Sequence, residues 1–411
     1  MTERTDIVVV GAGIVGLATA HALATVQPSA SVVVVEKEAG VGHHQSSHNS
    51  GVLHAGVYYA PGSRKADLCR RGKDLMERFC ADRGIPVERN GKLVVATSEA
   101  ELPRFDALVA RAAANNLDGL AVLDQREMRA VEPHVSGLRG LHSPTTGVVD
   151  FGLVCEALAQ NLDVRAGVAV TGVAQHGERV VVSTASGDFQ AAAAVVCAGL
   201  WSEGLAARSG LPTSVRIVPF RGSWVALQPE GAALVRGNIY PVPDPDLPFL
   251  GVHFTRRIDG AVWAGPNAVL SLRYPELLGR AAAFPGSWRL GAAQHRVAVK
   301  ELWTERSRAT QLRAMRRYLP ALSGDDVAWD VRPHGVRAQA VDRAGRLVDD
   351  FILSRHRRVL HVLNAPSPAA TSALAIGRQL AEELAATVDV ATLHAVGAAA
   401  VEPPAVEGPG R

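Results

Sequence analysis

The first forty residues alternate between unbroken apolar runs and a glycine-rich turn. Two runs, Asp6–Val10 and Ser31–Glu36, are apolar at successive positions instead of every second one, which predicts parallel strands covered on both faces. Between them lie closely spaced glycines and then helix-forming residues over Ile14–Thr25. The chain is therefore predicted to open as a strand, a glycine turn, a helix and a second strand.

The same patterns predict further elements along the chain. Ser63–Arg83 has its apolar residues near one face and its basic residues elsewhere, as in an amphipathic helix. Between Val215 and about Val269, short apolar runs alternate with proline and glycine turns, which is typical of a mixed or antiparallel sheet. The other expected elements are a strand at Lys92–Ala96, a helix at Glu99–Asn115, a hairpin and a buried strand over Val180–Thr184 and Phe189–Cys197, and a basic helix at Glu301–Tyr318.

The strand–turn–helix pattern of the opening returns near the end of the chain. A predicted strand at Val359–Leu363 and a loop precede a long helix from about Ala369 to Ala386. The glycine turn at the start of the chain, GAGIVG, has the spacing of a dinucleotide-binding site, and a domain of that kind interrupted in this way is more typical of FAD than of NAD proteins. Ser367 is expected to N-cap the helix, with Pro368 at its first position. The positive helix end would suit the pyrimidine edge of a reduced flavin, although a routine capped surface helix is the alternative.

The opening turn, GAGIVG, has the G-x-G-x-x-G spacing of a dinucleotide-binding site. Gly11 permits a tight turn, Gly13 lets a pyrophosphate approach the backbone, and Gly16 lets the helix pack close to the sheet. Glu36 ends the next strand and suits the ribose hydroxyls of an adenosine, which disfavours NADP. An ordinary βαβ turn with a chance acidic residue is the alternative.

Composition narrows the class of protein. Of the 411 residues, 47% are hydrophobic and 20% charged, which excludes disordered, collagen-like and coiled-coil chains. The net charge of +3 gives no support for nucleic acid as a partner. Four cysteines lack the spacing of a disulfide framework, and no run of apolar residues is long enough to span a membrane. We expect a reduced, cytoplasmic setting.

Six longer strings carry more specific information. They are HHQSSHNSGVLHAGVYYAPGS (43–63), PFRG (219–222), NIYPVPDPDLPFLGVHFTRRIDG (238–260), GPNAV (265–269), GVRAQAVD (335–342) and NAPSPAATS (364–372). In this order, they resemble the L-2-hydroxyglutarate dehydrogenase/oxidase family, a branch of the D-amino-acid-oxidase-like FAD enzymes. The resemblance runs from about residue 5 to residue 385. The stretch from Arg273 to about Arg332 departs from the family pattern.

The resemblance implies an α/β fold with two domains. A Rossmann-like FAD-binding domain would be assembled from separated segments, 1–88, 140–214 and 326–395. An α+β substrate domain on a mixed or antiparallel sheet would comprise 89–139 and 215–325, and 396–411 would be a flexible tail. The implied activity is oxidation of L-2-hydroxyglutarate to 2-oxoglutarate, with FAD as the hydride acceptor at N5 and oxygen or a quinone as the final electron acceptor.

The resemblance also implies which residues contact FAD. The glycine turn and the end of the second strand would bind the ADP half, with a backbone group of Val170 contacting adenine. The residues around Gln45 and the loop after Leu363 would contact the flavin. The full set is Gly11, Gly13, Ile14, Val15, Gly16, Glu36, Lys37, Gln45, Ser46, Asn49, Ser50, Gly51, Val170, Ala198, Gly199, Asn364, Ala365, Ser367, Pro368, Ala369, Ala370 and Thr371.

Oxidation of a 2-hydroxy acid needs a base for the hydroxyl proton and cations for the carboxylate. Histidine suits the first role, and both His54 and His253 lie inside family-like strings, so either is a candidate base. Arginine suits the second, because its planar guanidinium binds a carboxylate with two hydrogen bonds. The candidate substrate-binding residues are Arg221, Tyr240, Arg256, Arg257 and Arg337. Each also has a structural interpretation, and Arg256 and Arg257 point to opposite strand faces, so at most one should face the site.

A histidine cluster and a basic stretch each have a simpler interpretation than a functional one. The cluster His43, His44, His48 and His54 has no spacing of a common zinc site, so no metal is expected. The basic stretch 273–317, which includes two tryptophans, is compatible with peripheral docking on an anionic inner-membrane face, whereas a solvated helix face is the simpler interpretation. The rival functions are oxidation of another 2-hydroxy or 2-amino (di)carboxylic acid on the same scaffold, and non-catalytic flavin binding.

Overall fold

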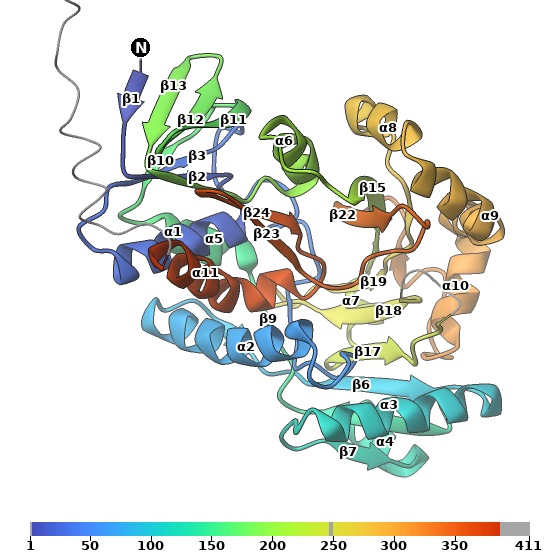
Figure 1. Ribbon diagram of the computed structural model, residues 1–411. Helices are drawn as coiled ribbons and strands as arrows, with labels where there is room; N and C mark the ends of the chain where they lie inside the picture. The colour runs from blue at the N-terminus through green and yellow to red at the C-terminus, as the bar shows by residue number, and fades with distance from the viewer. Residues whose placement is uncertain (1, 246–249, 387–411) are drawn as a thin grey trace, which may run out of the picture.

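The computed structural model describes residues 2–245 and 250–386 and contains two main sheets, each with its own helices (Figure 1). The first has six strands in the order β10-β3-β2-β14-β24-β23, and every neighbouring pair is parallel except β24 with β23. Its strands are β2 (Ile7–Val10), β3 (Val32–Val35), β10 (Asp163–Arg165), β14 (Ala193–Val196), β23 (Ile352–His356) and β24 (Val359–Asn364).

The return of the chain to this sheet confirms the expected interrupted α/β domain. Val195 in β14 pairs with Val9 on one side and with Leu360 on the other. The strand from the end of the chain therefore lies within the same sheet as the strand from its beginning. The three strands β2, β14 and β24 are buried along their whole length, as the unbroken apolar runs predict.

Four helices lie on one side of the six-stranded sheet and pack against one another (Figure 1). They are α1 (Ile14–Val26), α2 (Arg64–Asp82), α5 (Phe151–Ala159) and α11 (Ala369–Ala385). Glycines let them approach closely. A Cβ on Gly377 of α11 would lie 2.5 Å from the carbonyl carbon of Ala18 in α1. A Cβ on Gly72 of α2 would lie 2.5 Å from the Cα of Ser372 in α11. The three helices thus pack nearly backbone to backbone.

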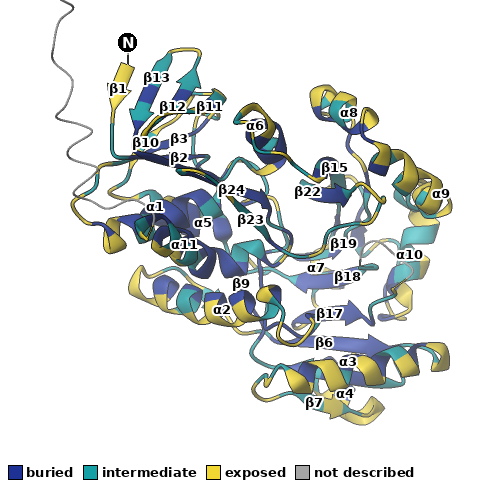
Figure 2. Cartoon of the chain, in the orientation of Figure 1, coloured by how far each residue is buried: buried dark blue, intermediate teal, exposed yellow. Residues whose placement is uncertain are grey.

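The other face of the six-stranded sheet packs against a four-stranded sheet through a core of valine and other apolar side chains. This smaller sheet has the order β1-β13-β12-β11 and contains the expected hairpin. Its strands are β1 (Thr2–Arg4), β11 (Val170–His176), β12 (Arg179–Thr184) and β13 (Gly187–Ala191). Figure 2 shows the buried central strands between these two coverings.

The second main sheet has eight strands and is mostly antiparallel, as expected for the middle of the chain. Its order is β21-β16-β19-β18-β17-β6-β8-β7, with only β17 and β6 parallel. The strands are β6 (Lys92–Ala96), β7 (Ala121–Leu123), β8 (Arg139–Ser143), β16 (Val225–Leu227), β17 (Asn238–Pro241), β18 (His253–Arg256), β19 (Val262–Gly265) and β21 (Val327–Ala328).

The two faces of this sheet have different neighbours. Leu93 and Phe254 belong to one core, which includes residues of α4 (Gln125–Val131) and α10 (Arg308–Arg316). Val94 and Tyr240 belong to another core, with α3 (Leu102–Ala114) and the loop around Val57. That loop follows β4 (Val52–Leu53), which contacts α11 of the six-stranded half, so this second face lies toward that half of the molecule.

Smaller elements connect the two halves. The antiparallel pair β15 (Val215–Ser223) and β22 (His334–Asp342) is the longest, and β20 (Val269–Leu270) joins it. The others are β4 (Val52–Leu53), β5 (Val87–Glu88), β9 (Gly147–Val149), α6 (Ser202–Arg208), α7 (Pro229–Ala232), α8 (Pro275–Ala282) and α9 (Pro285–Arg306), with single 3-10 turns at Glu99–Glu101 and Gly199–Trp201.

Two details of the sequence prediction are wrong. The basic helix expected at 301–318 is instead two helices, α9 and α10, because the Ser307 side chain accepts the N–H of Thr310 and caps a new helix. Ser367 does not cap α11, since the N-cap position is Pro368. The Ser367 hydroxyl instead hydrogen-bonds the side chain of Tyr59.

The expected domain boundaries stay a prediction. β8 and β21 lie close to two of these boundaries and pair within the eight-stranded sheet. The expected tail, 396–411, lies outside the described residues. Within the described part of the chain, none of the helices has the length and apolar character needed to cross a bilayer.

Candidate active site

The glycine turn between β2 and α1 leaves no space for side chains. Gly11 has a φ of +101°, and a Cβ there would lie 2.5 Å from the carbonyl oxygen of Cys197. A Cβ on Gly16 would lie 1.9 Å from the Gly11 carbonyl oxygen. Gly13 is the N-cap of α1 and supplies no capping side chain. The positive end of α1 is therefore presented beside a bare backbone turn, as an anion such as pyrophosphate requires.

The carboxylate of Glu36 is held beside this turn. It accepts the N–H of Ala12 at 2.7 Å and the N–H of Glu38 at 2.9 Å. These two bonds fix the carboxylate at the end of β3. The neighbouring backbone of Val168 also donates to the Glu36 carbonyl at 2.7 Å, so the chain leading into Val170 passes close by. The contact of Val170 with adenine stays a prediction.

The loop 42–51 is folded by its own side chains. The Asn49 amide donates to the carbonyls of Gln45 and Ser46, and its oxygen accepts the N–H of Gly51. The Ser46 hydroxyl accepts the N–H of Ile14 at 2.9 Å, which ties the loop to the first turn of α1. These residues are expected to contact FAD, and the structure shows that Asn49 also shapes the loop.

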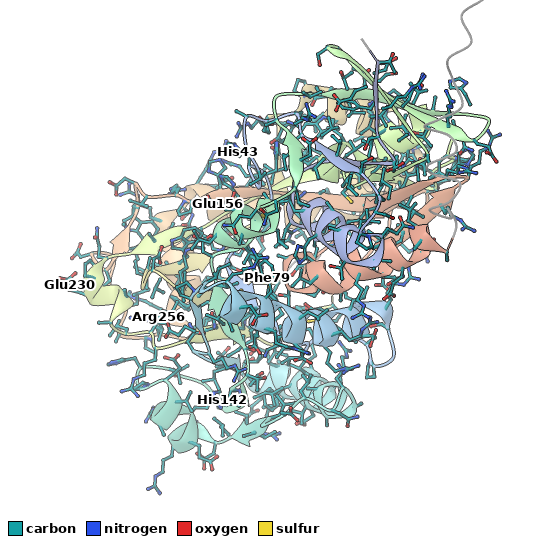
Figure 3. The ribbon with its side chains drawn as sticks, turned by 90° about the vertical axis from the view of Figure 1, so that its left-hand side faces the viewer. His43, Phe79, His142, Glu156, Glu230 and Arg256 are labelled. Carbon is teal, nitrogen blue, oxygen red and sulfur yellow. The ribbon has the colours of Figure 1, made fainter. Side chains whose placement is uncertain are left out.

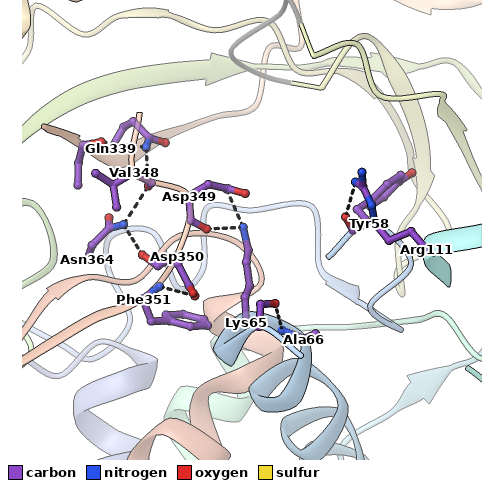
Figure 4. Close-up of polar contacts among 12 residues, drawn as sticks. Tyr58, Lys65, Ala66, Arg111, Gln339, Val348, Asp349, Asp350, Phe351 and Asn364 are labelled. Atoms are coloured by element: carbon purple, nitrogen blue, oxygen red, sulfur yellow. Dashed lines mark hydrogen bonds and ion pairs between the residues drawn. The ribbon is translucent and has the colours of Figure 1, made fainter. Parts of the chain in front are cut away.

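The loop 364–371, at the start of α11, is held from two sides. The Asn364 amide donates to the carbonyls of Val348 and Asp350, at 3.1 and 2.8 Å (Figure 4). The Thr371 hydroxyl accepts the backbone N–H of His54 at 3.1 Å. This contact brings two family-like strings, 43–63 and 364–372, together. The side-chain amide oxygen of Asn364, Oδ1, is buried and has no hydrogen-bond partner within the described residues.

These features fit FAD. The turn at Gly11 and Gly16 is a cradle that any Cβ would fill, and the end of α1 supplies positive charge. Glu36 supplies an acceptor for ribose hydroxyls, and Asn364 supplies an unused buried acceptor. Gly199 follows β14 with a φ of +53° and lies against the Gln45 amide, which places Ala198 and Gly199 next to the same loop.

A row of polar side chains lies on the second face of the eight-stranded sheet. Lys92, Tyr240 and His253 come from the adjacent strands β6, β17 and β18. The His253 ring stacks on the Tyr240 ring with 4.1 Å between centroids, and the Lys92 Nζ lies 4.1 Å from the same Tyr240 centroid. We call these three residues, with His54 and Arg337, the polar cluster.

The hydrogen bond of His253 assigns its tautomer. Its Nδ1 lies 2.9 Å from the Gly251 carbonyl oxygen, which can only accept, so Nδ1 carries the proton. Its Nε2 is therefore left as the acceptor in the neutral ring. Burial, together with the charges of Lys92 and Arg337, lowers the pKa of His253 to about 3, although the hydrogen bond to Gly251 acts in the opposite direction. The ring is thus neutral at ordinary pH.

His54 has the opposite arrangement. Its Nδ1 lies 3.4 Å from the Lys92 Nζ. A charged lysine can only donate, so Nδ1 is the acceptor and the proton is on Nε2 whenever Lys92 is protonated. Burial holds the pKa of His54 well below its usual value, and the charge of Lys92 adds to this effect. His54 therefore presents an N–H donor where His253 presents an acceptor.

Sequence reasoning missed Lys92, which is 2% exposed. Burial lowers its pKa from 10.5 to about 7. A signal existed, because Lys92 begins a strand whose next four residues are apolar. An isolated lysine at a strand end is, however, usually a surface residue, so the pattern alone did not single it out.

Arg337 is the arginine that the structure brings to the polar cluster. It is buried, which lowers the pKa of its guanidinium, while the Asp349 carboxylate acts in the opposite direction. Asp349 also binds Lys65, whose Nζ lies 2.7 Å from the carboxylate and 2.9 Å from the Asp349 carbonyl (Figure 4). Lys65 and Asp349 are not among the predicted site residues, because they are 284 residues apart in sequence and only the fold brings them together.

The other three arginines are placed elsewhere. Arg221 forms an ion pair with Glu305. Arg256, labelled in Figure 3, donates to the Val235 carbonyl at 3.2 Å. Arg257 stacks on Trp263 at 3.9 Å and donates to the Asn49 carbonyl at 3.0 Å, so it braces the loop 42–51. Within the described residues, none of the three hydrogen-bonds or ion-pairs with the polar cluster, so their role in substrate binding stays a prediction.

The remaining predicted side chains have local partners. The Tyr240 hydroxyl lies 3.5 Å from that of Thr255, and burial raises its pKa to about 12. Lys37 forms an ion pair with Glu38 and lies over the Trp201 ring at 4.2 Å. His44 contacts the same Glu38 at 2.7 Å. Among residues 2–245 and 250–386, no three His, Cys, Asp or Glu side chains converge as metal ligands.

Comparison with known proteins identifies relatives along nearly the whole chain. Residues 6–383 match the family model described as FAD dependent oxidoreductase. The mitochondrial L-2-hydroxyglutarate dehydrogenase of Caenorhabditis briggsae is 42% identical, with 92% of each chain covered. The human mitochondrial protein of the same name is 39% identical, covering 93% of this chain and 89% of its own. The L-2-hydroxyglutarate dehydrogenase of Escherichia coli K12 is 40% identical, with 92% and 93% covered.

Solved structures share the fold at lower identity. L-α-glycerophosphate oxidase from Mycoplasma pneumoniae, with FAD bound, has a TM-score of 0.76 at 22% identity and covers 93% of this chain and 95% of its own. Glycine oxidase from Geobacillus kaustophilus has a TM-score of 0.70 at 18% identity, with 94% and 96% covered. These neighbours confirm the expected fold class.

The expected cytoplasmic location is contradicted. The relatives from Caenorhabditis briggsae, Nematostella vectensis, human and cattle all carry names that specify mitochondria. Composition and cysteine spacing could not indicate this, because proteins of the cytoplasm and of a reduced mitochondrial compartment both lack disulfide frameworks.

Proposed function

This chain belongs to the L-2-hydroxyglutarate dehydrogenase family of FAD-dependent oxidoreductases, and from that premise we propose that it oxidises L-2-hydroxyglutarate to 2-oxoglutarate. Its cofactor is FAD. The observation that carries the proposal is the polar cluster, which combines two neutral histidines of opposite tautomer with two buried cations. These are the groups that a 2-hydroxy diacid needs.

We propose that the six-stranded half holds FAD and that the second face of the eight-stranded sheet holds the substrate. Gly11, Gly13 and Gly16 would receive the pyrophosphate, and Glu36 the ribose. The loops 42–51 and 364–371 would surround the flavin, because they join at the contact between His54 and Thr371. When bound, the flavin accepts a hydride from the α carbon of the substrate.

His253 is the base in this proposal. Its Nε2 is the unprotonated nitrogen, and the Gly251 carbonyl stabilises the imidazolium that forms when Nε2 accepts the hydroxyl proton. A pKa of about 3 describes the protein without substrate. Arrival of a carboxylate nearby raises the pKa of the ring, so His253 becomes a stronger base only when substrate is present.

His54 and Arg337 position the substrate. The Nε2–H of His54 donates a hydrogen bond to the substrate, since its Nδ1 faces Lys92. Arg337 binds the C1 carboxylate beside the reacting carbon, because its charge acts on His253 and its guanidinium can form two parallel bonds. Burial strengthens both interactions by excluding water.

Anaerobic mixing with L-2-hydroxyglutarate tests the function. We expect the visible absorption of the oxidised flavin to bleach, with one equivalent of 2-oxoglutarate formed per flavin. D-2-hydroxyglutarate is the matched control, because the opposite configuration points the α hydrogen away from the flavin. If another 2-hydroxy or 2-amino acid bleaches the flavin and L-2-hydroxyglutarate does not, the proposed substrate is wrong.

The final electron acceptor is oxygen or a quinone. The reduced protein, prepared with substrate, is mixed with oxygenated buffer in one experiment and with a soluble quinone under nitrogen in another. The acceptor that restores the oxidised spectrum at the rate of steady-state turnover is the one the protein uses.

A further inference from the structure

Lys92 is buried without a carboxylate. Its contacts in the described part of the chain are the His54 ring nitrogen at 3.4 Å, the Tyr240 ring at 4.1 Å and the Tyr58 ring at 5.2 Å. All three are neutral groups. Aromatic faces stabilise a cation only in part, and transfer of an unpaired ammonium out of water is costly.

The other buried lysines in the described residues are paired. Lys65 lies 2.7 Å from the carboxylate of Asp349, and Lys73 lies 2.7 Å from that of Glu77. All three lysines are less than a tenth exposed. Lys92 is therefore exceptional in having no anion, and it is the one that points into the polar cluster.

An unpaired buried lysine is a ready counter-ion for an anionic ligand. Its low pKa, about 7, shows that the ammonium is poorly stabilised while no anion is present. Binding of a carboxylate within hydrogen-bond distance would restore the charged form. The stability lost by burying Lys92 is thus recovered when the substrate binds.

We propose that Lys92 binds the distal carboxylate of the substrate and so selects 2-hydroxy diacids over 2-hydroxy monoacids. The assignment rests on the proposed function, which supplies the diacid. Within it, His253 receives the hydroxyl proton and Arg337 binds the C1 carboxylate, which leaves Lys92 as the remaining cation of the polar cluster.

The spacing agrees with this role. Lys92 and His253 lie on the two strands that flank β17, each 4.1 Å from the centroid of the same Tyr240 ring. The Lys92 Nζ is therefore separated from the His253 ring centre by no more than twice that distance. The carbon chain between the hydroxyl and the distal carboxylate, with a hydrogen bond at each end, covers such a separation.

Replacement of Lys92 by methionine tests the proposal. The oxidised FAD-loaded protein is titrated with 2-oxoglutarate and with 2-oxovalerate, which has the same chain but lacks the second carboxylate, and the flavin spectrum reports binding. For Lys92→Met we expect the Kd of 2-oxoglutarate to rise about 10- to 100-fold, since a charge-assisted hydrogen bond is lost. The Kd of 2-oxovalerate should change less than about threefold or improve.

Lys73→Met is the matched control, because it removes a buried lysine that is already paired. It should leave the ratio of the two Kd values unchanged. If Lys92→Met weakens both ligands equally, or neither, Lys92 does not bind the distal carboxylate. Wild-type protein that L-2-hydroxyglutarate fails to bleach would instead contradict the proposed function.

A measurement on the wild-type protein does not depend on the folding of any variant. At pH 8, calorimetry in buffers of different ionisation enthalpy should show uptake of a proton when 2-oxoglutarate binds, because Lys92 becomes charged. 2-Oxovalerate should cause much less uptake. Equal uptake with both ligands would contradict the assignment.

Discussion

Two histidines of the same site differ because their partners differ. A carbonyl holds the proton on Nδ1 of His253, whereas an ammonium holds it away from Nδ1 of His54. Their residue type and their burial are shared, so neither property separates base from donor. The sequence leaves both as candidates for the base, and the partner atoms decide between them.

Replacement of each histidine by glutamine should separate the two roles. We expect His253→Gln to slow flavin reduction about 10²- to 10⁴-fold, the usual contribution of a general base. His54→Gln should slow it about tenfold or less, because glutamine keeps an N–H donor. Stopped-flow reduction under nitrogen measures both. A larger loss in His54→Gln than in His253→Gln would reverse the assignment.

The pH profile of kcat/KM should follow Lys92. The groups that face it are His54, Tyr58, Cys69, Tyr240 and His253, and burial keeps all of these neutral near pH 7. The protonated lysine binds the carboxylate, so kcat/KM should be level below pH 7. Above pH 7 it should fall, approaching tenfold per pH unit, as the lysine loses its proton. Lys92→Met should abolish this fall. A wild-type profile that stays level up to pH 9 would contradict a role for the charge of Lys92 in substrate binding.

At the scale of elements, close helix packing makes the cofactor half sensitive to one methyl group. A Cβ on Gly377 would overlap the backbone of α1, the helix that begins at the glycine turn. A Cβ on Gly279, in the middle of α8, would instead meet no atom outside its own helix within 4 Å. The two glycines are thus a matched pair with opposite environments.

Gly377→Ala should destabilise the protein by about 1–3 kcal/mol, because overpacking forces a backbone shift. FAD should also be retained less well, since the shift reaches the start of α1. Gly279→Ala should be neutral or stabilise by up to about 1 kcal/mol, through helix propensity. Thermal unfolding and the flavin content after gel filtration measure the two effects. Similar changes in both variants would show that helix packing is not the cause.

Much of the fold was predictable because its signals are local. Unbroken apolar runs indicate the buried strands β2 and β24, and the GAGIVG turn indicates the nucleotide site. The contacts of Arg221 and Lys92 were not predictable, because their partners Glu305 and His54 are distant in sequence. An arginine next to a glycine looks equally suited to a substrate or to a glutamate until the fold brings one of them within reach.

At the scale of the whole molecule, several histidines are buried as neutral rings. His361 in β24 is the plainest case, because neither ring nitrogen has a hydrogen-bond partner within the described residues. Burial lowers the pKa of His361 to about 4 and that of His253 to about 3. In the unfolded chain these rings gain a proton near pH 6.5, whereas in the folded protein they do so only near pH 3–4.

The stability of the protein should therefore be highest above pH 6.5 and fall as the pH drops from 6.5 towards 4. Over that range the unfolded chain binds more protons than the folded one. His361→Leu should raise Tm, by about 2 °C or more at pH 5 and by less at pH 8. Thermal unfolding at both pH values tests this. An increase that is the same at both would show that packing, and not protonation, is responsible.

The place of β24 has a consequence for synthesis on the ribosome. This strand pairs with β14 in the sheet that holds the glycine turn, yet it is translated only after most of the eight-stranded sheet, whose strands β16, β17, β18, β19 and β21 lie between the two in sequence. Until it emerges, β14 has an unpaired backbone edge, and such an edge invites pairing with other nascent chains. The sheet that carries the glycine turn is therefore complete only after β24 has been translated.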